Sequence, residues 1–319
     1  MNKIPVINCI SNIVTANDCA NVLLAAGFSP IMADEPAEMA EIALAADACV
    51  INLGTPSDRK YDAAAKAGTA YNSLHKPVVI DPVGIAVSSY RRENAAKLLK
   101  HISPDVVRCN LNEALALLNI TEHIKDNAES CAERGDNLIY EYPPHESSCR
   151  DESCHDKTGL DKPAEQNNSE SGYKHVKDMT GVQPCGIDSR ENTDTALCTA
   201  PETAAKLAVS LDCVVLISGA VDTVSDGSRT KLISGGSDRL KEITGSGCML
   251  SVLLGGYCAD ACINSDGADL FEAVCRCASD YKHAAELAVS WLSEHGGTGE
   301  LRMRLIDAAG AVMNGKHRQ

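Results

Sequence analysis

The sequence is poor in aromatic residues and in basic residues. One Trp, eight Tyr and two Phe are the only aromatic side chains among 319 residues, so aliphatic side chains and Ala must build the core. Lys and Arg number 29 against 44 Asp and Glu, which gives a formal net charge of −15. A chain this acidic repels phosphate backbones and anionic lipids, so we expect neither a nucleic-acid nor a membrane partner.

Long apolar runs and targeting signals are not evident either. We find no run of the roughly 18 apolar residues that a membrane span requires, and we expect no transmembrane segment. Met1, Asn2 and Lys3 lead directly into a strand-like run, without the apolar region and cleavage site of a signal peptide. The 15 cysteines are odd in number, and several lie in apolar runs, such as Cys49 and Cys213. We therefore expect buried free thiols and a cytoplasmic protein.

Short apolar segments alternate with helical segments along most of the chain. The expected strands are residues 6–10, 48–53, 77–81, 105–110 and 213–218. Their apolar residues are continuous rather than alternating, which is typical of parallel strands covered on both faces. Helices are expected at residues 17–26, 35–46, 59–74, 91–101, 247–261, 269–291 and 302–313, with Pro36 in the first turn of the second helix. This order predicts an α/β fold with a central, mostly parallel sheet and helices on both faces.

One segment, residues 121–193, interrupts this pattern. Only eight of its 73 residues are Ile, Leu, Val, Met, Phe or Trp, and its 16 acidic and 8 basic residues contribute −8 to the net charge. So few apolar side chains cannot offset the entropy of ordering the chain, so we expect a largely disordered acidic insertion. Residues 1–120 and 194–319 then form a single domain. Cys149, Cys154 and His155 lack the paired spacing of common zinc sites, which favours a solvated segment over a metal site.

The most specific local motif is Thr244-Gly245-Ser246-Gly247-Cys248, directly before an apolar helical run. Small residues at a helix start leave backbone N–H groups free to bind an anion, so we predict an anion cradle at Gly245, Ser246 and Gly247. An ordinary Gly-rich helix start is the alternative. Cys248 in the same first turn is expected to have a lowered thiol pKa, as a base or nucleophile would. The sequence contains no Gly-x-x-x-x-Gly-Lys-Ser/Thr motif, which excludes a P-loop.

Two carboxylates follow predicted strands, where open α/β sheets place their ligands. Asp81 closes one apolar run, and Glu113 belongs to an Asn-x-x-Glu motif after the next. Such carboxylates could hold Mg²⁺ directly or through water, although each could instead be a helix cap or a loop residue. Arg108 is either a surface cation or a forked donor to a phosphate.

Together these motifs resemble the hydroxyethylthiazole kinase family of thiamine biosynthesis, within the ribokinase-like superfamily. The matching pieces follow one order along the chain and lie at residues 8–12, 21–27, 29–32, 52–55, 76–83, 108–113, 186–189, 218–222, 244–248 and 297–299. Only residues 121–185 are expected to lack a counterpart in the family.

The resemblance implies a ribokinase-like fold and assigns a role to each matching residue. It places Met32, Gly245 and Asn12 at the thiazole alcohol, Arg108 and Ser218 at ATP, and Asp81 and Glu113 at Mg²⁺. Cys248 takes the position of the catalytic base. It further implies a homotrimer with active sites where subunits meet.

The activity implied by the resemblance is ATP- and Mg²⁺-dependent phosphorylation of 4-methyl-5-(2-hydroxyethyl)thiazole to its monophosphate. Two alternatives remain: a ribokinase-like kinase for another small alcohol, and a non-catalytic protein that binds the thiazole or a nucleotide. Asp81, Glu113, Arg108 and Gly245 are all present, which argues against a decayed enzyme. A thiol hydrolase that uses Cys248 is less favoured, because the sequence links no His to it.

Overall fold

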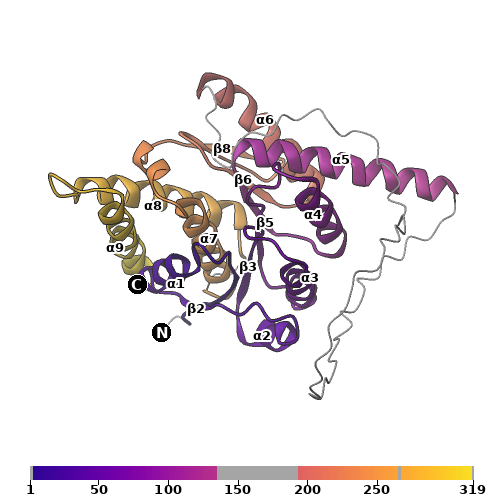
Figure 1. Ribbon diagram of the computed structural model, residues 1–319, viewed down its shortest axis with the longest axis horizontal. Coiled ribbons are helices and arrows are strands. Elements are labelled where there is room, and N and C mark those ends of the chain that lie inside the picture. Colours follow the sequence, from indigo (N-terminus) through magenta and orange to yellow (C-terminus); the bar gives the residue numbers. More distant parts are fainter. Residues whose placement is uncertain (1–2, 135–192, 265–266, 318–319) are drawn as a thin grey trace, which may run out of the picture. The chain divides into compact units, whose positions relative to one another are not determined.

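The computed structural model describes residues 3–134, 193–264 and 267–317. Within these residues, eight strands form one sheet in the order β2-β1-β3-β4-β5-β6-β7-β8 (Figure 1). The strands are β1 (Val6–Ile10), β2 (Ser29–Ile31), β3 (Ala48–Asn52), β4 (Val78–Asp81), β5 (Val106–Cys109), β6 (Val214–Ile217), β7 (Asp222–Ser225) and β8 (Thr230–Ile233). All pairs up to β5–β6 are parallel, whereas β7 and β8 add two antiparallel strands. The α/β fold with a mostly parallel sheet is thus confirmed.

The strands that the sequence predicted are those with continuous apolar runs. β1, β3, β4, β5 and β6 are buried along most of their length, because helices cover both faces of the sheet. The prediction omitted three strands. β2 has only three residues and contains Pro30, and the first three residues of β8 are exposed. β7 is buried although it consists of Asp222, Thr223, Val224 and Ser225, a polar sequence that does not predict a strand.

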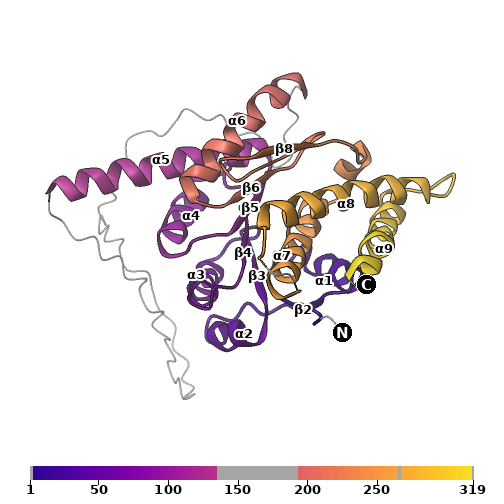
Figure 2. The ribbon, with the colours of Figure 1, turned by 180° about the vertical axis from the view of Figure 1, so that it is seen from behind.

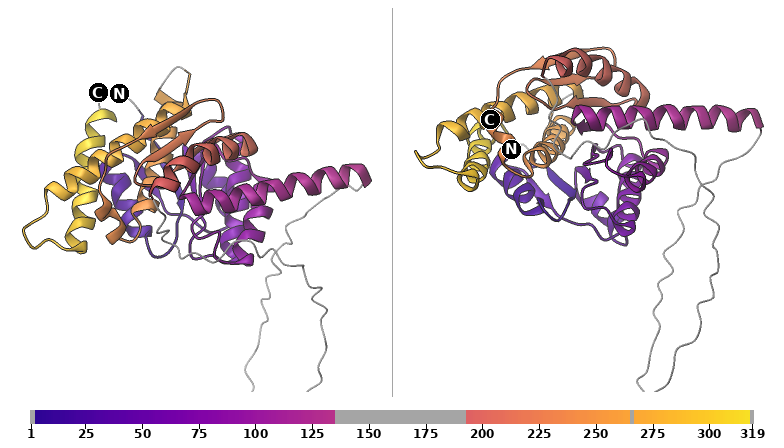
Figure 3. Two further views of the ribbon diagram at one scale, coloured as in Figure 1. Left: turned by 90° about the horizontal axis from the view of Figure 1, so that it is seen from above. Right: turned by 45° about the horizontal axis from the view of Figure 1, so that its top comes forward.

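Helices cover both faces of the sheet, as Figures 1 and 2 show from opposite sides. One face carries α1 (Ala16–Ala26), α7 (Ser246–Asn264), α8 (Leu270–Ser290) and α9 (Thr298–His317). The other carries α2 (Met39–Ala45), α3 (Asp58–Ser73), α4 (Ser89–His101), α5 (Leu111–Arg134) and α6 (Thr193–Leu211). α5 and α6 pack side by side (Figure 3). The predicted start of α2 was wrong, since the helix begins at Met39 and Pro36 precedes it.

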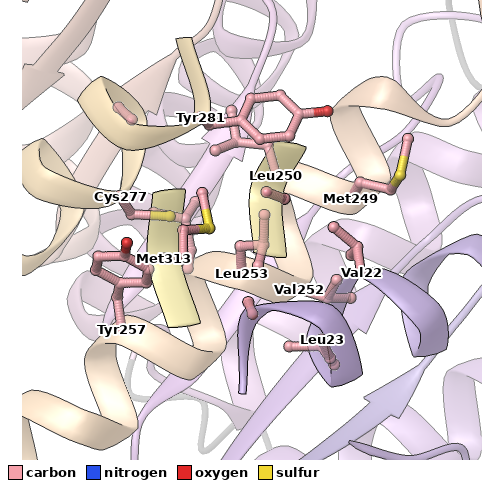
Figure 4. Packing of buried hydrophobic residues seen from close by; sticks show 14 of the residues in the cluster. Val22, Leu23, Met249, Leu250, Val252, Leu253, Tyr257, Cys277, Tyr281 and Met313 are labelled. Atoms are coloured by element: carbon pink, nitrogen blue, oxygen red, sulfur yellow. The ribbon is translucent and has the colours of Figure 1, made fainter. Parts of the chain in front are cut away.

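The main core lies between the sheet and the helices α1, α7, α8 and α9. Val22 and Leu23 of α1 pack there with Met249, Leu250 and Leu253 of α7 (Figure 4). Contrary to the expectation from the sequence, α7 is long and apolar enough to meet the length and composition criteria for a membrane span. It is nevertheless the central helix of this core, because most of its side chains are buried against the sheet and neighbouring helices.

The segment expected to be a disordered insertion is partly helical. α5 continues through Arg134, and α6 begins at Thr193. Residues 121–134 therefore extend the helix that begins at Leu111 in the core. The helix continues beyond the point where apolar residues become sparse, since its backbone hydrogen bonds do not depend on apolar side chains. Residues 135–192, including Cys149, Cys154 and His155, lie outside the described residues.

Candidate functional site

Polar side chains gather at the carboxyl ends of three neighbouring parallel strands. Asn12 follows β1, Asn52 ends β3, and Asp81 ends β4. In the sheet register, Asn52 lies beside Asp81. The first turn of α7 meets these strand ends and brings Cys248 to them. This is the edge of an open α/β sheet where ligands bind.

Cys248 lies in a buried hydrogen-bond network. Its Sγ accepts amide N–H groups from Asn12 Nδ2 at 3.3 Å and from Asn52 Nδ2 at 3.2 Å. Asn52 Nδ2 also donates to Asp81 Oδ2 at 2.8 Å, and Ser251 Oγ donates to the same oxygen at 2.8 Å. The thiol thus has two amide donors, and the carboxylate is fixed from two elements.

The expectation of a lowered Cys248 pKa was wrong. Cys248 is only 8% exposed, and burial together with the nearby Asp81 carboxylate raises the pKa of its thiol. Desolvation disfavours the thiolate more strongly here than the amide donors favour it. The group is mainly a neutral thiol at neutral pH.

Arg108 connects Asp81 to the neighbouring strand end. Its Nη1 lies 3.7 Å from Asp81 Oδ1, and its Nη2 donates to Ser218 Oγ at 2.5 Å. Ser218 follows β6, so the guanidinium spans the ends of β4, β5 and β6. Arg108 Nε is buried and without a hydrogen-bond partner, so the five N–H donors of this guanidinium are not all satisfied by the protein.

At the start of α7, the backbone of two glycines lies very close to neighbouring side chains. Gly245 has φ +92°, and a Cβ there would lie 2.6 Å from Thr15 Cγ2. A Cβ on Gly247 would lie 2.3 Å from Arg108 Nη1. The N–H groups of a helix's first turn lack intrahelical partners, so the helix terminus and a guanidinium present positive charge at one place. This arrangement fits a phosphate.

Asp81 and Glu113 are two buried carboxyl groups that influence each other. Burial, followed by the Asp81 charge, raises the pKa of Glu113 to about 7. Burial also raises the pKa of Asp81, although Arg108 and hydrogen bonds from Ser251 and Asn52 act in the opposite direction. Asp81 Oδ1 has no hydrogen-bond partner. Two carboxyls beside a single guanidinium fit a divalent cation, which would favour their charged forms.

Glu113 also has a structural role that the sequence left open. Its Oε2 accepts the Asn110 N–H at 3.0 Å, and Asn110 Oδ1 accepts the Glu113 N–H at 2.9 Å, which is a reciprocal capping box at the start of α5. Its Oε1 accepts the Gly84 N–H at 2.7 Å. Among the described residues, no three His, Cys, Asp or Glu side chains are grouped to hold a metal. Both Glu113 oxygens already accept backbone N–H groups, so a cation would approach this carboxylate more easily through water than by direct ligation.

The structure brings most of the predicted site residues together. Asn12, Asp81, Arg108, Ser218, Gly247 and Cys248 are connected by the contacts above, and Gly245 and Ser246 adjoin them at the start of α7. Glu113 is linked to Asp81 by charge rather than by a hydrogen bond, and Met32 is the exception. Met32 follows the edge strand β2 and is 37% exposed. In the part of the chain that the structure describes, the hydrogen-bond network does not reach it.

Sequence reasoning missed three polar residues of the site: Asn52, Ser251 and Lys60. Lys60 is 8% exposed, and its Nζ donates to the Gly54 carbonyl at 2.6 Å. Burial lowers the pKa of Lys60 to about 8. Asn52 had a signal, since it lies next to the end of the strand predicted at residues 48–53. Ser251 and Lys60 lie inside helices and cannot be distinguished from solvent-facing residues by sequence.

The fold has clear counterparts among solved structures. Hydroxyethylthiazole kinase from Pyrococcus horikoshii superposes with a TM-score of 0.67 at 25% identity, covering 97% of this chain and 88% of that one. Pyridoxal kinase of Bacillus subtilis shares the fold with a TM-score of 0.52 at 15% identity, covering 88% of this chain and 91% of that one. The architecture is that of the ribokinase-like kinases.

Relatives with similar sequences narrow the class of ribokinase-like kinases to one family. A hydroxyethylthiazole kinase from Alkaliphilus oremlandii is 32% identical over 306 residues, 96% of this chain and 88% of that protein. One from Clostridium beijerinckii is 31% identical over 307 residues, 96% of this chain and 87% of that protein. The model of the hydroxyethylthiazole kinase family matches residues 1–135 and 150–314. The chain belongs to the hydroxyethylthiazole kinase family.

The family match also corrects the interpretation of the insertion. Residues 121–185 were expected to lack a counterpart, but the family model leaves out only residues 136–149 between its two matched parts. The polar composition of this segment leaves few apolar residues by which short motifs could indicate the relationship.

Proposed function

We propose that this protein transfers the γ-phosphoryl group of ATP to the hydroxyl of 4-methyl-5-(2-hydroxyethyl)thiazole and forms its monophosphate for thiamine biosynthesis or salvage. The observation that carries the proposal is the convergence of Arg108 on the start of α7 at Gly247. A helix N-terminus and a guanidinium at one place favour a transferring phosphoryl group, whose negative charge is spread over its oxygens.

Arg108 and Ser218 form the nucleotide side of the proposed site, and Asn12, Met32 and Gly245 form the alcohol side. The N–H groups of Gly245, Ser246 and Gly247 hold the phosphoryl between them. Cys248 lies next to the acceptor hydroxyl, but only its minor thiolate form can accept the hydroxyl proton, because the neutral thiol that predominates already carries its own. The hydroxyl proton therefore leaves late, with little help from this side chain. That suits phosphoryl transfer, which depends more on positioning and charge stabilisation than on proton removal.

Mg²⁺ would be held by Asp81, whose Oδ1 is buried without a hydrogen-bond partner, and by Glu113 through water. When bound, it would offset the charge of the ATP phosphates. The charge of Arg108 favours the ionised form of Asp81 against the opposing effect of burial, and Asn52 and Ser251 hold the other carboxylate oxygen in place. These contacts orient Asp81 Oδ1, the oxygen that has no hydrogen-bond partner.

A homotrimer with sites between subunits is the assembly that we propose. Its support is an apolar surface beside the site, since Ile13 is 82% and Val14 65% exposed directly after Asn12, and Met32 is exposed on the neighbouring strand end. Exposed apolar side chains next to a binding site fit a surface that another subunit covers. The ten described cysteine side chains are all free thiols, which supports the cytoplasm as the compartment.

ADP release with Mg-ATP, measured with the thiazole alcohol and with a panel of other small alcohols, tests the proposal. We expect strong stimulation by the thiazole alcohol alone. Stimulation by a different alcohol would reassign the substrate. Heat of binding with the thiazole alcohol but no ADP release would contradict a kinase and indicate a binding protein.

A further inference from the structure

A buried lysine on α8 lies near the nucleotide side of the site but outside the contacts described above. Lys282 is 8% exposed. Its Nζ donates to three backbone carbonyls, those of Gly219 and Ala220 at 3.1 Å and that of Gly235 at 3.3 Å. The same atom lies 3.2 Å from Asp222 Oδ1. Four oxygens therefore surround an ammonium with three protons, which leaves Lys282 no free donor for a substrate.

Lys282 joins two turns that are separate in the sequence. Gly219 and Ala220 form the turn between β6 and β7, directly after Ser218. Gly235 follows β8 and precedes the 3₁₀ helix η1 (Asp238–Glu242). Asp222 Oδ1 also accepts the Gly219 N–H at 2.9 Å, so the first turn is held from both its N–H and its carbonyl groups.

Two other residues of α8 form hydrogen bonds with backbone groups near these turns, one at the start of α7 and one at Gly236. Tyr281 OH donates to the carbonyl of Ser246 at 2.6 Å, at the start of α7, and Figure 4 shows Tyr281 beside Leu250 of that helix. Glu286, one turn beyond Lys282, accepts the Gly236 N–H at 2.8 Å. α8 is thus attached to the anion cradle and to both turns through Tyr281, Lys282 and Glu286.

Holding two turns together with a buried ammonium group carries a large desolvation free energy. Removing a charge from water costs several kcal/mol unless it is fully paired, whereas a neutral donor would satisfy a carbonyl group without that cost. Lys282 does what a neutral donor cannot, because it neutralises buried Asp222 and binds three carbonyls from two turns at one point. The two turns consequently cannot move apart without exposing both charges.

We infer that Lys282 is a positioning residue for the nucleotide, which fixes the Gly219–Ala220 turn against the Gly235 turn so that both form the wall next to Ser218. The inference rests on the proposed ATP site at Arg108 and Ser218. The alcohol side, formed by Asn12 and Gly245, has no contact with Lys282. Loss of the ammonium is therefore expected to weaken ATP binding selectively.

The test is calorimetric titration of Mg-ATP and, separately, of the thiazole alcohol into wild type and Lys282→Ala. We expect at least a tenfold weaker ATP dissociation constant and a thiazole dissociation constant within twofold of wild type. Ammonium chloride should restore ATP affinity, since ammonium fits the same four oxygens, whereas tetramethylammonium chloride at equal ionic strength should not. Lys241→Met serves as the control, because Lys241 is an exposed cation on η1.

Unchanged ATP affinity in folded Lys282→Ala would overturn the inference. Equal weakening of both ligands, or no recovery with ammonium, would also overturn it, since either result indicates a general structural role. If Lys282→Ala does not fold, Asp222→Asn/Lys282→Met removes both buried charges together, and normal ATP affinity in that variant would be decisive against the inference. Absence of ATP binding by wild type would instead contradict the proposed function.

Discussion

The guanidinium of Arg108 lies against the backbone of Gly247, so closely that a Cβ on this glycine would be 2.3 Å from Nη1. The contact explains why a glycine follows Ser246 in the first turn of α7. It also places the positive end of the helix beside the cation that pairs with Asp81. The two features that attract an anion therefore depend on each other's position.

Gly247→Ala should weaken ATP binding because the added methyl group must displace the guanidinium. A shifted Arg108 loses its contacts with Ser218 and Asp81, and we expect KM for ATP to rise roughly tenfold, which corresponds to about 1.4 kcal/mol. Initial rates over a range of Mg-ATP concentrations measure the effect. Gly299→Ala in α9 is the matched control, since a Cβ there meets nothing within 4 Å. An unchanged KM in folded Gly247→Ala would show that Arg108 does not hold the nucleotide.

Substitutions of Cys248 test how much the reaction depends on a base. Cys248→Ala should keep measurable activity, with kcat lowered by no more than about a hundredfold, because proton removal contributes little to a loose transition state. Cys248→Asp should be at least as active as wild type, since the amide N–H groups of Asn12 and Asn52 that contact Sγ suit a carboxylate. Steady-state kinetics with saturating ATP and thiazole alcohol measure both variants.

Loss of all turnover in a Cys248→Asp protein that still binds both ligands would contradict this view. It would indicate chemistry that requires the sulfur itself, such as a covalent intermediate. Cys248→Ser is a useful companion, because its hydroxyl keeps an acceptor for the two amide groups while removing the sulfur.

The sequence was informative about the parallel part of the sheet and its polar strand ends. Apolar runs such as Ala48–Asn52 need burial on both faces, and Asp81 stands out because it ends such a run. The antiparallel edge was not predictable in the same way. Strand β7 is polar, and Asp222 within it is buried because Lys282, 60 positions further along the chain, pairs with it.

The pKa of Cys248 shows why a local rule failed. Its position in the first turn of α7 predicts a lowered pKa, and that argument uses only neighbours in the sequence. The opposing effects are burial and the Asp81 carboxylate, which reaches the thiol only after β4 and α7 have packed together. Properties set by long-range packing, like those of Ser251 and Lys60, require the structure.

Ile13→Asp tests the proposed assembly. Ile13 is 82% exposed beside Asn12, so the change should not affect the fold of one subunit, but a carboxylate in an apolar contact between subunits is costly. We expect sedimentation velocity to show trimers for wild type and smaller species for the variant, with a lower kcat/KM for the thiazole alcohol. Leu44→Asp, at a 70% exposed position of α2, is the control. A monomeric wild type would contradict the proposed trimer.

Lys60 should make stability depend on pH in a specific direction. Burial lowers its pKa from 10.5 to about 8 in the folded protein, so between these two values the unfolded chain binds the proton more tightly than the folded one. Stability from this group therefore rises with pH across that window, and below it the charged, buried ammonium remains a cost. Lys60→Met cannot show this increase in stability with pH, because its side chain does not titrate.

Urea unfolding at pH 7.5 and at pH 9.5 measures the difference. Wild type should gain roughly 1 kcal/mol relative to Lys60→Met between the two values, since one pKa unit corresponds to about 1.4 kcal/mol and partial access of solvent reduces the effect. Lys66→Met on the same helix is the control, because Lys66 is exposed and pairs with Asp62. Comparing variants removes the contribution of other titrating groups, which all three proteins share. Parallel pH dependence in wild type and Lys60→Met would show that Lys60 stays protonated throughout, and hence that the Gly54 carbonyl and nearby charges compensate for its burial.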